Sequence, residues 1–315
     1  MASSPIVSVS IDLDAVACYY QIHALGSPPA DESRFAILRR ALPRFVALFG
    51  EFGIPSTLFT VAKDLEEDPE GRALIASLSH SGHEIASHSY SHPYNLVRLP
   101  PGEMAGEIDK AHAVLSEVCG RAPVGFRAPG YEISGPLIDH LCQRGYRYDS
   151  STFPAIPYYL AKAAVMAAIR ATGRASGSIL GSPRVLFAPR EPYHPAAGAP
   201  YAKGSLPIVE LPVTVTPGLR LPVIGTSLVM APAWLRRRLV ASALSTPHFN
   251  LELHGIDLAD AATDGFPTAL AGKQPDLRKP LSAKLAALRE TFARARDAGA
   301  TFQTLETAAS SFPSS

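Results

Sequence analysis

Short β-rich segments alternate with helical segments along most of this 315-residue chain. The predicted strands cover residues 6–11, 54–61, 83–86, 124–127, 146–148, 206–215, 249–253 and 301–302. The predicted helices cover residues 33–52, 70–81, 101–119, 135–144, 158–171, 233–244 and 281–298. Within the first of these segments, Pro43 is expected in the first turn of a second helical piece. Strands that alternate with helices of this length form a parallel sheet with the helices outside it. The pattern therefore predicts an α/β fold whose chemistry lies at the strand ends.

Composition excludes several classes of function. The chain has 29 basic and 28 acidic residues, so its formal net charge of +1 favours neither nucleic acid nor an anionic membrane as a partner. No apolar run approaches the roughly 20 residues that a membrane span needs. The three cysteines, Cys18, Cys119 and Cys142, show no CxxC spacing, and the N-terminus lacks the features of a secretion signal. We therefore expect a cytoplasmic protein without a transmembrane segment.

Two carboxylates and two histidines follow predicted strands. Asp12 and Asp14 end the first strand, and residues i and i+2 of an extended segment point the same way. Their carboxylates therefore face one point, unless the pair only caps a turn. His88 and His92 are four residues apart, a spacing that places two imidazoles on one face of a helical turn and suits a single metal ion. A lone histidine is more often structural, but two at this spacing favour a metal site.

Polar residues close two further strands. His254 ends an apolar strand, and Asp257 follows three residues later. This pattern is typical of a general acid whose pKa a carboxylate raises, although a histidine that caps a loop fits it equally. Arg127 closes another strand, where its guanidinium could neutralise Asp12. Gly130 lets the backbone approach a ligand closely, so its N–H could face an oxyanion.

Five motifs occur together in a fixed order. They are Asp12-Leu13-Asp14, His88-Ser89-Tyr90-Ser91-His92, Arg127-Ala128-Pro129-Gly130, Tyr148-Asp149-Ser150-Ser151 and Leu251-Glu252-Leu253-His254. With these motifs the chain resembles the polysaccharide deacetylases, also called NodB-homology or carbohydrate esterase family 4 proteins, over about residues 5–150 and 248–305. The family usually has adjacent aspartates in the first motif. With Leu13 between them, the chain resembles a cytoplasmic branch that includes peptidoglycan-deacetylase-like proteins, lipid-linked sugar deformylases and allantoinase-like amidohydrolases.

The resemblance implies a distorted (β/α) barrel of about seven parallel strands. We expect residues 1–315 to form one such domain, with an insertion at about 153–235 over the mouth of the barrel. This span is rich in Pro, Gly and small residues and interrupts the alternation of strands and helices. It could be a lid, an apolar wall for a lipid-linked substrate or an interface between subunits. The sequence leaves these three alternatives and the oligomeric state open.

The resemblance also implies a metal centre and its base. Asp14, His88 and His92 would hold a divalent ion, for which a nitrogen and oxygen site favours Zn²⁺ and accepts Co²⁺ or Ni²⁺. Asp12 would act as the catalytic base, and Arg127 would orient it.

The remaining implied roles concern the acid and the substrate. His254 would act as the acid, and Asp149 would support the acid or the polar network of the site. Asp149 and Asp257 stay alternatives for the carboxylate that keeps His254 charged. Gly130 and Tyr131 would face the oxyanion or the substrate, and Gly130 stands where the family usually has an aromatic residue.

These expectations combine into a function. We expect a metal-dependent hydrolase that removes an acetyl or formyl group from an N-acylated amino sugar, whether free or lipid-linked. One alternative is an allantoinase-like hydrolase of a cyclic amide or ureide, although relatives of that kind can lack a complete metal triad. The other is a non-catalytic carbohydrate-binding barrel, although a retired site usually loses a ligand or its acid and base.

Overall fold

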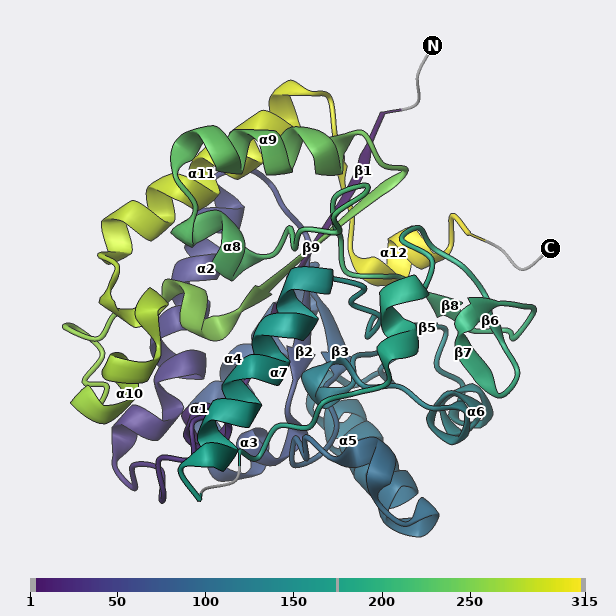
Figure 1. The fold of residues 1–315 in the computed structure, drawn as a ribbon, viewed down its shortest axis with the longest axis horizontal. Helices are drawn as coiled ribbons and strands as arrows, with labels where there is room; N and C mark the ends of the chain where they lie inside the picture. Colours follow the sequence, from purple (N-terminus) through teal and green to yellow (C-terminus); the bar gives the residue numbers. More distant parts are fainter. Residues whose placement is uncertain (1–3, 174–175, 313–315) are drawn as a thin grey trace.

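The protein is described here by a computed structural model that covers residues 4–173 and 176–312. Eight parallel strands form its central sheet (Figure 1). They are β1 (Ile6–Asp12), β2 (Ser56–Thr60), β3 (Glu84–Ser87), β4 (Gly125–Phe126), β5 (Tyr148–Asp149), β8 (Val209–Glu210), β9 (His248–His254) and β10 (Thr301–Phe302). The hydrogen-bonded order is β10-β1-β2-β3-β4-β5-β8, and β9 pairs with β1 along its free edge.

The sheet curves into an incomplete barrel. β9 pairs with β1 over the whole of both strands, up to Asp12 opposite His254. At the other edge, the N–H of Thr214, shortly after β8, donates a 3.2 Å hydrogen bond to the carbonyl of Asn250 in β9. Within the described residues, seven strands therefore surround the interior, and the short β10 adds to the beginning of β1. The predicted barrel of about seven parallel strands is confirmed.

Helices cover the outside of the barrel. They are α1 (Val16–Ile22), α2 (Leu42–Gly50), α3 (Ala62–Glu67), α4 (Pro69–His80), α5 (Pro101–Cys119), α6 (Gly135–Arg144), α7 (Ile156–Ala171), α8 (Gly225–Met230), α9 (Ala233–Leu244), α10 (Thr268–Lys273), α11 (Leu281–Asp297) and α12 (Leu305–Ala309). In Figure 1, α2, α8, α9 and α11 lie together on one side of β1 and β9. None of the helices in the described residues is both long and apolar enough to cross a bilayer.

The predicted break within the helical segment of residues 33–52 is confirmed, because a second helical piece starts beside Pro43. Residues 33–52 form a 3₁₀ turn (Glu32–Phe35), a π-helical turn (Ile37–Ala41) and then α2 rather than one helix. Pro43 lies in the first turn of α2. Because proline has no backbone N–H, it cannot continue the helical hydrogen bonds of the preceding turn. The chain accordingly widens before Pro43 and starts a new helix at Leu42.

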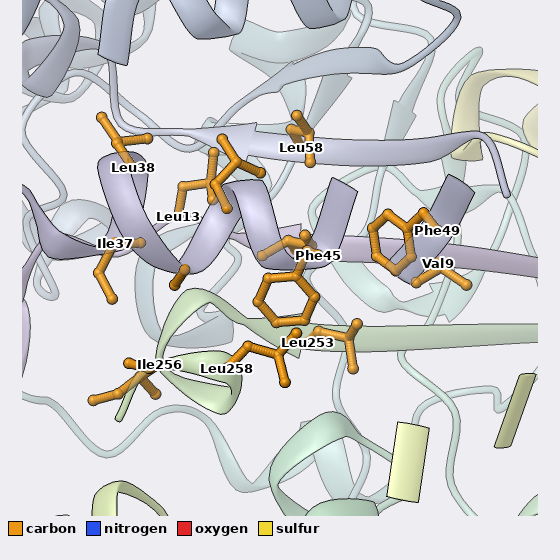
Figure 2. Packing of buried hydrophobic residues seen from close by; sticks show 14 of the residues in the cluster. Val9, Leu13, Ile37, Leu38, Phe45, Phe49, Leu58, Leu253, Ile256 and Leu258 are labelled. Carbon is orange, nitrogen blue, oxygen red and sulfur yellow. The ribbon is translucent and has the colours of Figure 1, made fainter. Parts of the chain in front are cut away.

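Outward-facing strand residues build the main hydrophobic core. Val9 of β1, Leu58 of β2 and Leu253 of β9 are fully buried. Figure 2 shows them with Phe45 and Phe49 of α2, whose rings pack against this layer. Complete burial of each phenylalanine contributes about 1.5–3 kcal/mol. The outer layer therefore fixes the strands against the helices.

The inward-facing residues of β1 and β9 are polar instead. Because side chains alternate along a strand, Ser10 and Asp12 face the barrel interior when Val9 faces the helices. The register of the parallel pair places Ser10 opposite Glu252 and Asp12 opposite His254. Buried polar groups must find partners inside the protein. The interior is consequently a network of hydrogen bonds and charge pairs that opens at the carboxyl ends of the strands.

The chain between β5 and α9 follows a different pattern. It contains α7, a hairpin of β6 (Pro195–Ala196) and β7 (Ala199–Lys203), the barrel strand β8, and α8. The ring of Tyr158 in α7 lies 6.0 Å from the ring of Tyr131, so the start of α7 lies beside the carboxyl ends of the strands. No residue of α7 is buried, and Leu160 is 60% exposed. That residues of about 153–235 are an insertion stays a prediction.

Candidate metal centre

Three predicted ligands converge at the carboxyl end of the barrel. Nε2 of His88 lies 3.2 Å from Oδ1 of Asp14, and Nε2 of His92 lies 3.3 Å from the same oxygen. One ligand atom from each of these buried residues falls within 4.8 Å of the other two. Asp14 follows β1 and His88 follows β3, so the strand ends bring together residues that are far apart in the chain.

The donor atoms of this cluster fit a cation. Nδ1 of His88 lies 2.7 Å from the carbonyl oxygen of Arg127. Since a carbonyl oxygen only accepts, the neutral ring carries its proton on Nδ1 and turns the Nε2 lone pair toward Asp14. Among the described residues, Oδ1 of Asp14 and Nε2 of His92 have no hydrogen-bond partner. Buried acceptors that face one another at this distance need a positive charge between them, which a divalent ion would supply.

The segment that carries the two histidines differs from the prediction. Residues 88–92 form an irregular loop rather than a helical turn. Ser89 and His92 both adopt left-handed backbone conformations, with φ of 64° and 57°, and the N–H of His92 donates a 3.0 Å hydrogen bond to Oγ of Ser89. A left-handed residue reverses the chain direction locally. The loop therefore brings both imidazoles to one point without helical spacing.

Asp12 and Arg127 form a buried charge pair beside the metal ligands. Nη1 of Arg127 donates a 2.5 Å hydrogen bond to Oδ1 of Asp12, and both side chains are almost completely buried. The guanidinium also donates through Nε to the carbonyl of Ser150 at 2.7 Å and through Nη2 to Oγ of the same serine at 2.8 Å. Burial raises the pKa of Asp12, and Arg127 opposes that rise. The carboxylate is thus oriented and keeps the basicity that proton transfer requires.

The carboxylate that supports His254 was missed from the sequence. Oε1 of Glu252 lies 2.7 Å from Nδ1 of His254. Burial alone lowers the pKa of His254, but the Glu252 carboxylate raises it well above the usual 6.5. Asp257, one of the two predicted partners, instead accepts a 2.9 Å hydrogen bond from the backbone N–H of His254. The alternation of side chains along a strand could have identified Glu252, because residues two apart, such as Glu252 and His254, lie on the same face of β9.

Asp149, the other predicted partner, does not reach the site. Tyr148 points into the barrel and donates a 2.7 Å hydrogen bond to Glu84, so the next residue points outward. Oδ1 of Asp149 accepts from Ser151 at 2.7 Å, and the carboxyl group pairs with the buried Glu210. Burial and the neighbouring Asp149 raise the pKa of Glu210 well above its ordinary 4.5. Asp149 thus lies beside Ser151 and Glu210 rather than beside His254, and its predicted role stays a prediction.

Glu210→Gln is expected to remove part of the pH dependence of stability. The folded protein keeps a proton on Glu210 that the unfolded chain loses near pH 4.5. Stability from this group is therefore complete below that pH and falls, by about 1.4 kcal/mol per pH unit, until the raised pKa is reached. Glutamine stays a neutral donor to Asp149 at every pH. Urea midpoints measured from about pH 5 to 8 should decline less in the variant, and equal slopes would contradict this proton on Glu210. The exposed Glu103→Gln is the control.

Gly130 and Tyr131 form one wall of the site. Gly130 adopts φ of 66°, and a Cβ added there would approach the Tyr94 ring to 3.2 Å. The carbonyl of Gly130 lies 3.3 Å from Nζ of Lys162 in α7. The hydroxyl of Tyr131 lies 3.2 Å from Nε2 of His254. Tyr131 therefore contacts the ring nitrogen that is not held by Glu252.

The family model for polysaccharide deacetylases matches residues 31–148. The peptidoglycan deacetylase of Helicobacter pylori is 29% identical over 163 residues, which cover 51% of this chain and 54% of that protein. A peptidoglycan deacetylase-like protein of Gibberella zeae is 30% identical over 150 residues, which cover 46% of this chain and 43% of that protein. The chain thus spans about half the length of the curated relatives it matches.

Solved structures share the fold over nearly the whole chain. A Mycobacterium smegmatis structure described as a polysaccharide deacetylase gives a TM-score of 0.62 at 21% identity, covering 100% of this chain and 95% of that one. The structure of Puue allantoinase gives a TM-score of 0.57 at 17% identity, covering 97% of this chain and 89% of that one. At these identities the likeness concerns the fold.

Proposed function

Because the chain belongs to the polysaccharide deacetylase family, we propose that it is a metal-dependent hydrolase that removes an acetyl or formyl group from an N-acylated amino sugar. The observation that carries this proposal is the convergence of Asp14, His88 and His92 within 4.8 Å. A base candidate and an acid candidate, Asp12 and His254, lie opposite each other in the register of β1 and β9 beside this cluster.

The metal ligands and the base have separate tasks in this proposal. A divalent ion held by Asp14, His88 and His92, with Zn²⁺ preferred over Co²⁺ or Ni²⁺, would polarise the amide carbonyl and make water more acidic. Asp12 accepts the proton of the attacking water on its carboxylate. Arg127 holds that carboxylate in place through Oδ1 and leaves Oδ2, which lies 4.0 Å from Nε2 of His88, directed toward the ligands.

The acid completes the reaction. Glu252 keeps His254 protonated at neutral pH, so the ring carries a proton on Nε2 that it can donate to the departing amine. An amine is a poor leaving group unless it is protonated, which makes this step necessary for an amide. The hydroxyl of Tyr131 holds the Nε2 proton until a substrate takes its place. The Gly130 N–H stays our candidate for binding the oxyanion.

The substrate is proposed at the level of an N-acylated amino sugar, free or lipid-linked. The name of the Helicobacter pylori relative supports a sugar substrate, and the fold shared with an allantoinase gives the ureide alternative no comparable support. The complete ligand triad together with both acid and base favours a hydrolase over a non-catalytic barrel. The free thiols of Cys18, Cys119 and Cys142 support a cytoplasmic location as part of the same proposal.

An amine-release assay tests the proposed function. Purified protein should release amine from N-acetylated or N-formylated glucosamine oligomers and not from allantoin. A chelator should abolish this release, and added Zn²⁺ should restore it, because the ligand triad needs its ion. Elemental analysis of the protein before and after chelation measures the metal directly. Turnover of allantoin alone, or full activity in metal-free protein, would contradict the proposal.

A further inference from the structure

A hollow of the protein lies beside the loop that follows Tyr131. It has a volume of about 840 Å³, which is in the range of sites for sugar-sized and drug-sized ligands. Its walls come from the segment after Tyr131, from residues 182–191, from the β6–β7 hairpin and from Arg220. None of the metal ligands and none of the acid and base candidates lines this cavity.

The cavity concentrates positive charge. Four cations line it against a single acid, Glu191; they are Arg184, Arg190, Lys203 and Arg220. The whole chain carries a formal charge of only +1, so this excess is a local feature. Within residues 4–173 and 176–312, none of the four cations forms a salt bridge. Like charges gathered without acidic partners raise the local potential and attract anions.

Two of these cations are partly buried, and one of them is held by a hydrogen bond. Arg190 and Arg220 are half-buried, and Nη1 of Arg220 donates a 2.9 Å hydrogen bond to the carbonyl of Ala188. Burial, together with the nearby Arg190, lowers the pKa of Arg220. Two guanidinium groups that line one cavity suit a carboxylate or a phosphate, whose oxygens can accept hydrogen bonds from both.

The rest of the lining suits a sugar. Tyr201, Pro189 and Pro200 provide apolar wall, and Phe187 is 85% exposed beside them. Small-molecule sites combine such apolar walls with a few well-placed polar groups. The cavity therefore offers a flat apolar surface next to an anion site.

The cavity and the metal centre share one loop. Tyr131 contacts His254 on the site side, whereas Ile133, Ser134 and Gly135 line the cavity. Tyr131 and Ile133 are two residues apart, so their Cα atoms lie within about 7 Å of each other. The hydroxyl of Tyr201 lies 3.4 Å from the backbone N of Ile133, which fixes the cavity wall to this loop. The cavity wall and the loop that carries Tyr131 are therefore continuous, and this continuity is the basis for assigning both to one extended ligand.

We propose that this cavity binds the anionic group, a carboxylate or a phosphate, of an acylated amino sugar whose acylamino group lies at the metal centre. The inference rests on the proposed function, because it names a part of the substrate of the same site. It predicts that the preferred substrate is an anionic saccharide rather than a neutral one.

Calorimetric binding to the full-length, metal-loaded protein tests the inference with two matched pairs of probes. The carboxylate pair is the disaccharide of N-acetylglucosamine and N-acetylmuramic acid against neutral chitobiose. The phosphate pair is N-acetylglucosamine 1-phosphate against N-acetylglucosamine. The wild type should bind the anionic member of at least one pair more tightly. The pair whose two members differ in affinity shows whether the anionic group is a carboxylate or a phosphate.

Arg190→Gln combined with Arg220→Gln should weaken binding of that anionic probe about tenfold or more, since each charged hydrogen bond contributes strongly. Binding of the neutral probe should not change. Lys273→Gln combined with Arg278→Gln removes two exposed cations outside the cavity and should leave both affinities unchanged. If the first pair fails to fold, Arg184→Gln with Lys203→Gln, both exposed, should weaken binding of the same anionic probe.

The outcomes separate this inference from the proposed function. Equal affinity of the wild type for both members of both pairs, or an equal loss for the control variant, would overturn the anion site. Discrimination of the anionic probe without any amine release would uphold the anion site and reject the hydrolase. A third outcome is amine release from chitobiose that the charge variants do not affect, together with equal binding of anionic and neutral probes. This outcome would uphold the hydrolase and reject the anion site.

Discussion

His92→Ala is expected to abolish bound metal and amide hydrolysis together. Nε2 of His92 lies 3.3 Å from Oδ1 of Asp14, and neither atom has another partner among the described residues. With one imidazole removed, Asp14 and His88 provide too few ligands for a stable divalent site, which normally has three protein ligands when one position is open. Turnover should fall by several orders of magnitude. Elemental analysis and the amine-release assay measure the two losses on the same sample.

A matched histidine controls for general effects of the substitution. His80 is exposed at the end of α4, and its Nδ1 contacts the carbonyl of Ala76 and the hydroxyl of Ser79 in the same helix. His80→Ala should leave metal content and turnover at the level of the wild type. Retention of stoichiometric metal by His92→Ala, with a normal circular dichroism spectrum, would show that the ion is held elsewhere.

His254→Ala is expected to keep the metal and lose amide hydrolysis by about 10²- to 10⁴-fold, the range for general acid catalysis. The ring belongs to the pair with Glu252 rather than to the ligand triad. An aryl ester separates the acid role from a structural one, because its leaving group departs without protonation. The variant should therefore hydrolyse 4-nitrophenyl acetate with a much smaller loss than the amide. An equal loss on ester and amide would contradict the acid assignment.

Glu252→Gln provides the matching test on the carboxylate. The negative charge of Glu252 raises the pKa of His254 in the folded protein. With neutral glutamine, burial would dominate and the imidazole would lose its proton at lower pH. The alkaline limb of the pH–rate profile should therefore move to lower pH, with activity partly regained in acid. An unchanged limb would exclude His254 as the group that titrates there.

Local patterns predicted the framework of the site well. Asp12 closes an apolar strand, and Arg127 closes another, so the sequence places both at the carboxyl ends of strands. The same reasoning reaches Glu252, because residues 252 and 254 share one face of a strand. Spacing from His254 favours Asp257 and the family motif favours Asp149, and neither criterion says which carboxylate shares a face with His254. Asp149 faces outward, which strand alternation relative to Tyr148 decides.

The loop of residues 88–92 lay beyond this kind of reasoning. Spacing of four residues is compatible with a helical turn, yet Ser89 and His92 adopt left-handed conformations that neither residue type favours by itself. Contacts from another element hold them there, since the N–H groups of Ala62 and Lys63 donate to the carbonyls of Ser89 and Tyr90. The strain is stabilised by partners that are distant in sequence.

The sequence by itself determined the alternation of strands and helices, the strand ends that carry the chemistry and the identity of the metal ligands we propose. These features follow from residues that are near one another in the chain, because backbone geometry sets the spacing at which side chains of a strand or a helix share one face. Only the tertiary structure decided that Glu252 holds His254, that Asp149 pairs with Glu210, and that Arg190 and Arg220 line one cavity. Each of these depends on which side chains meet in space, because charge and burial act over distance and not along the chain.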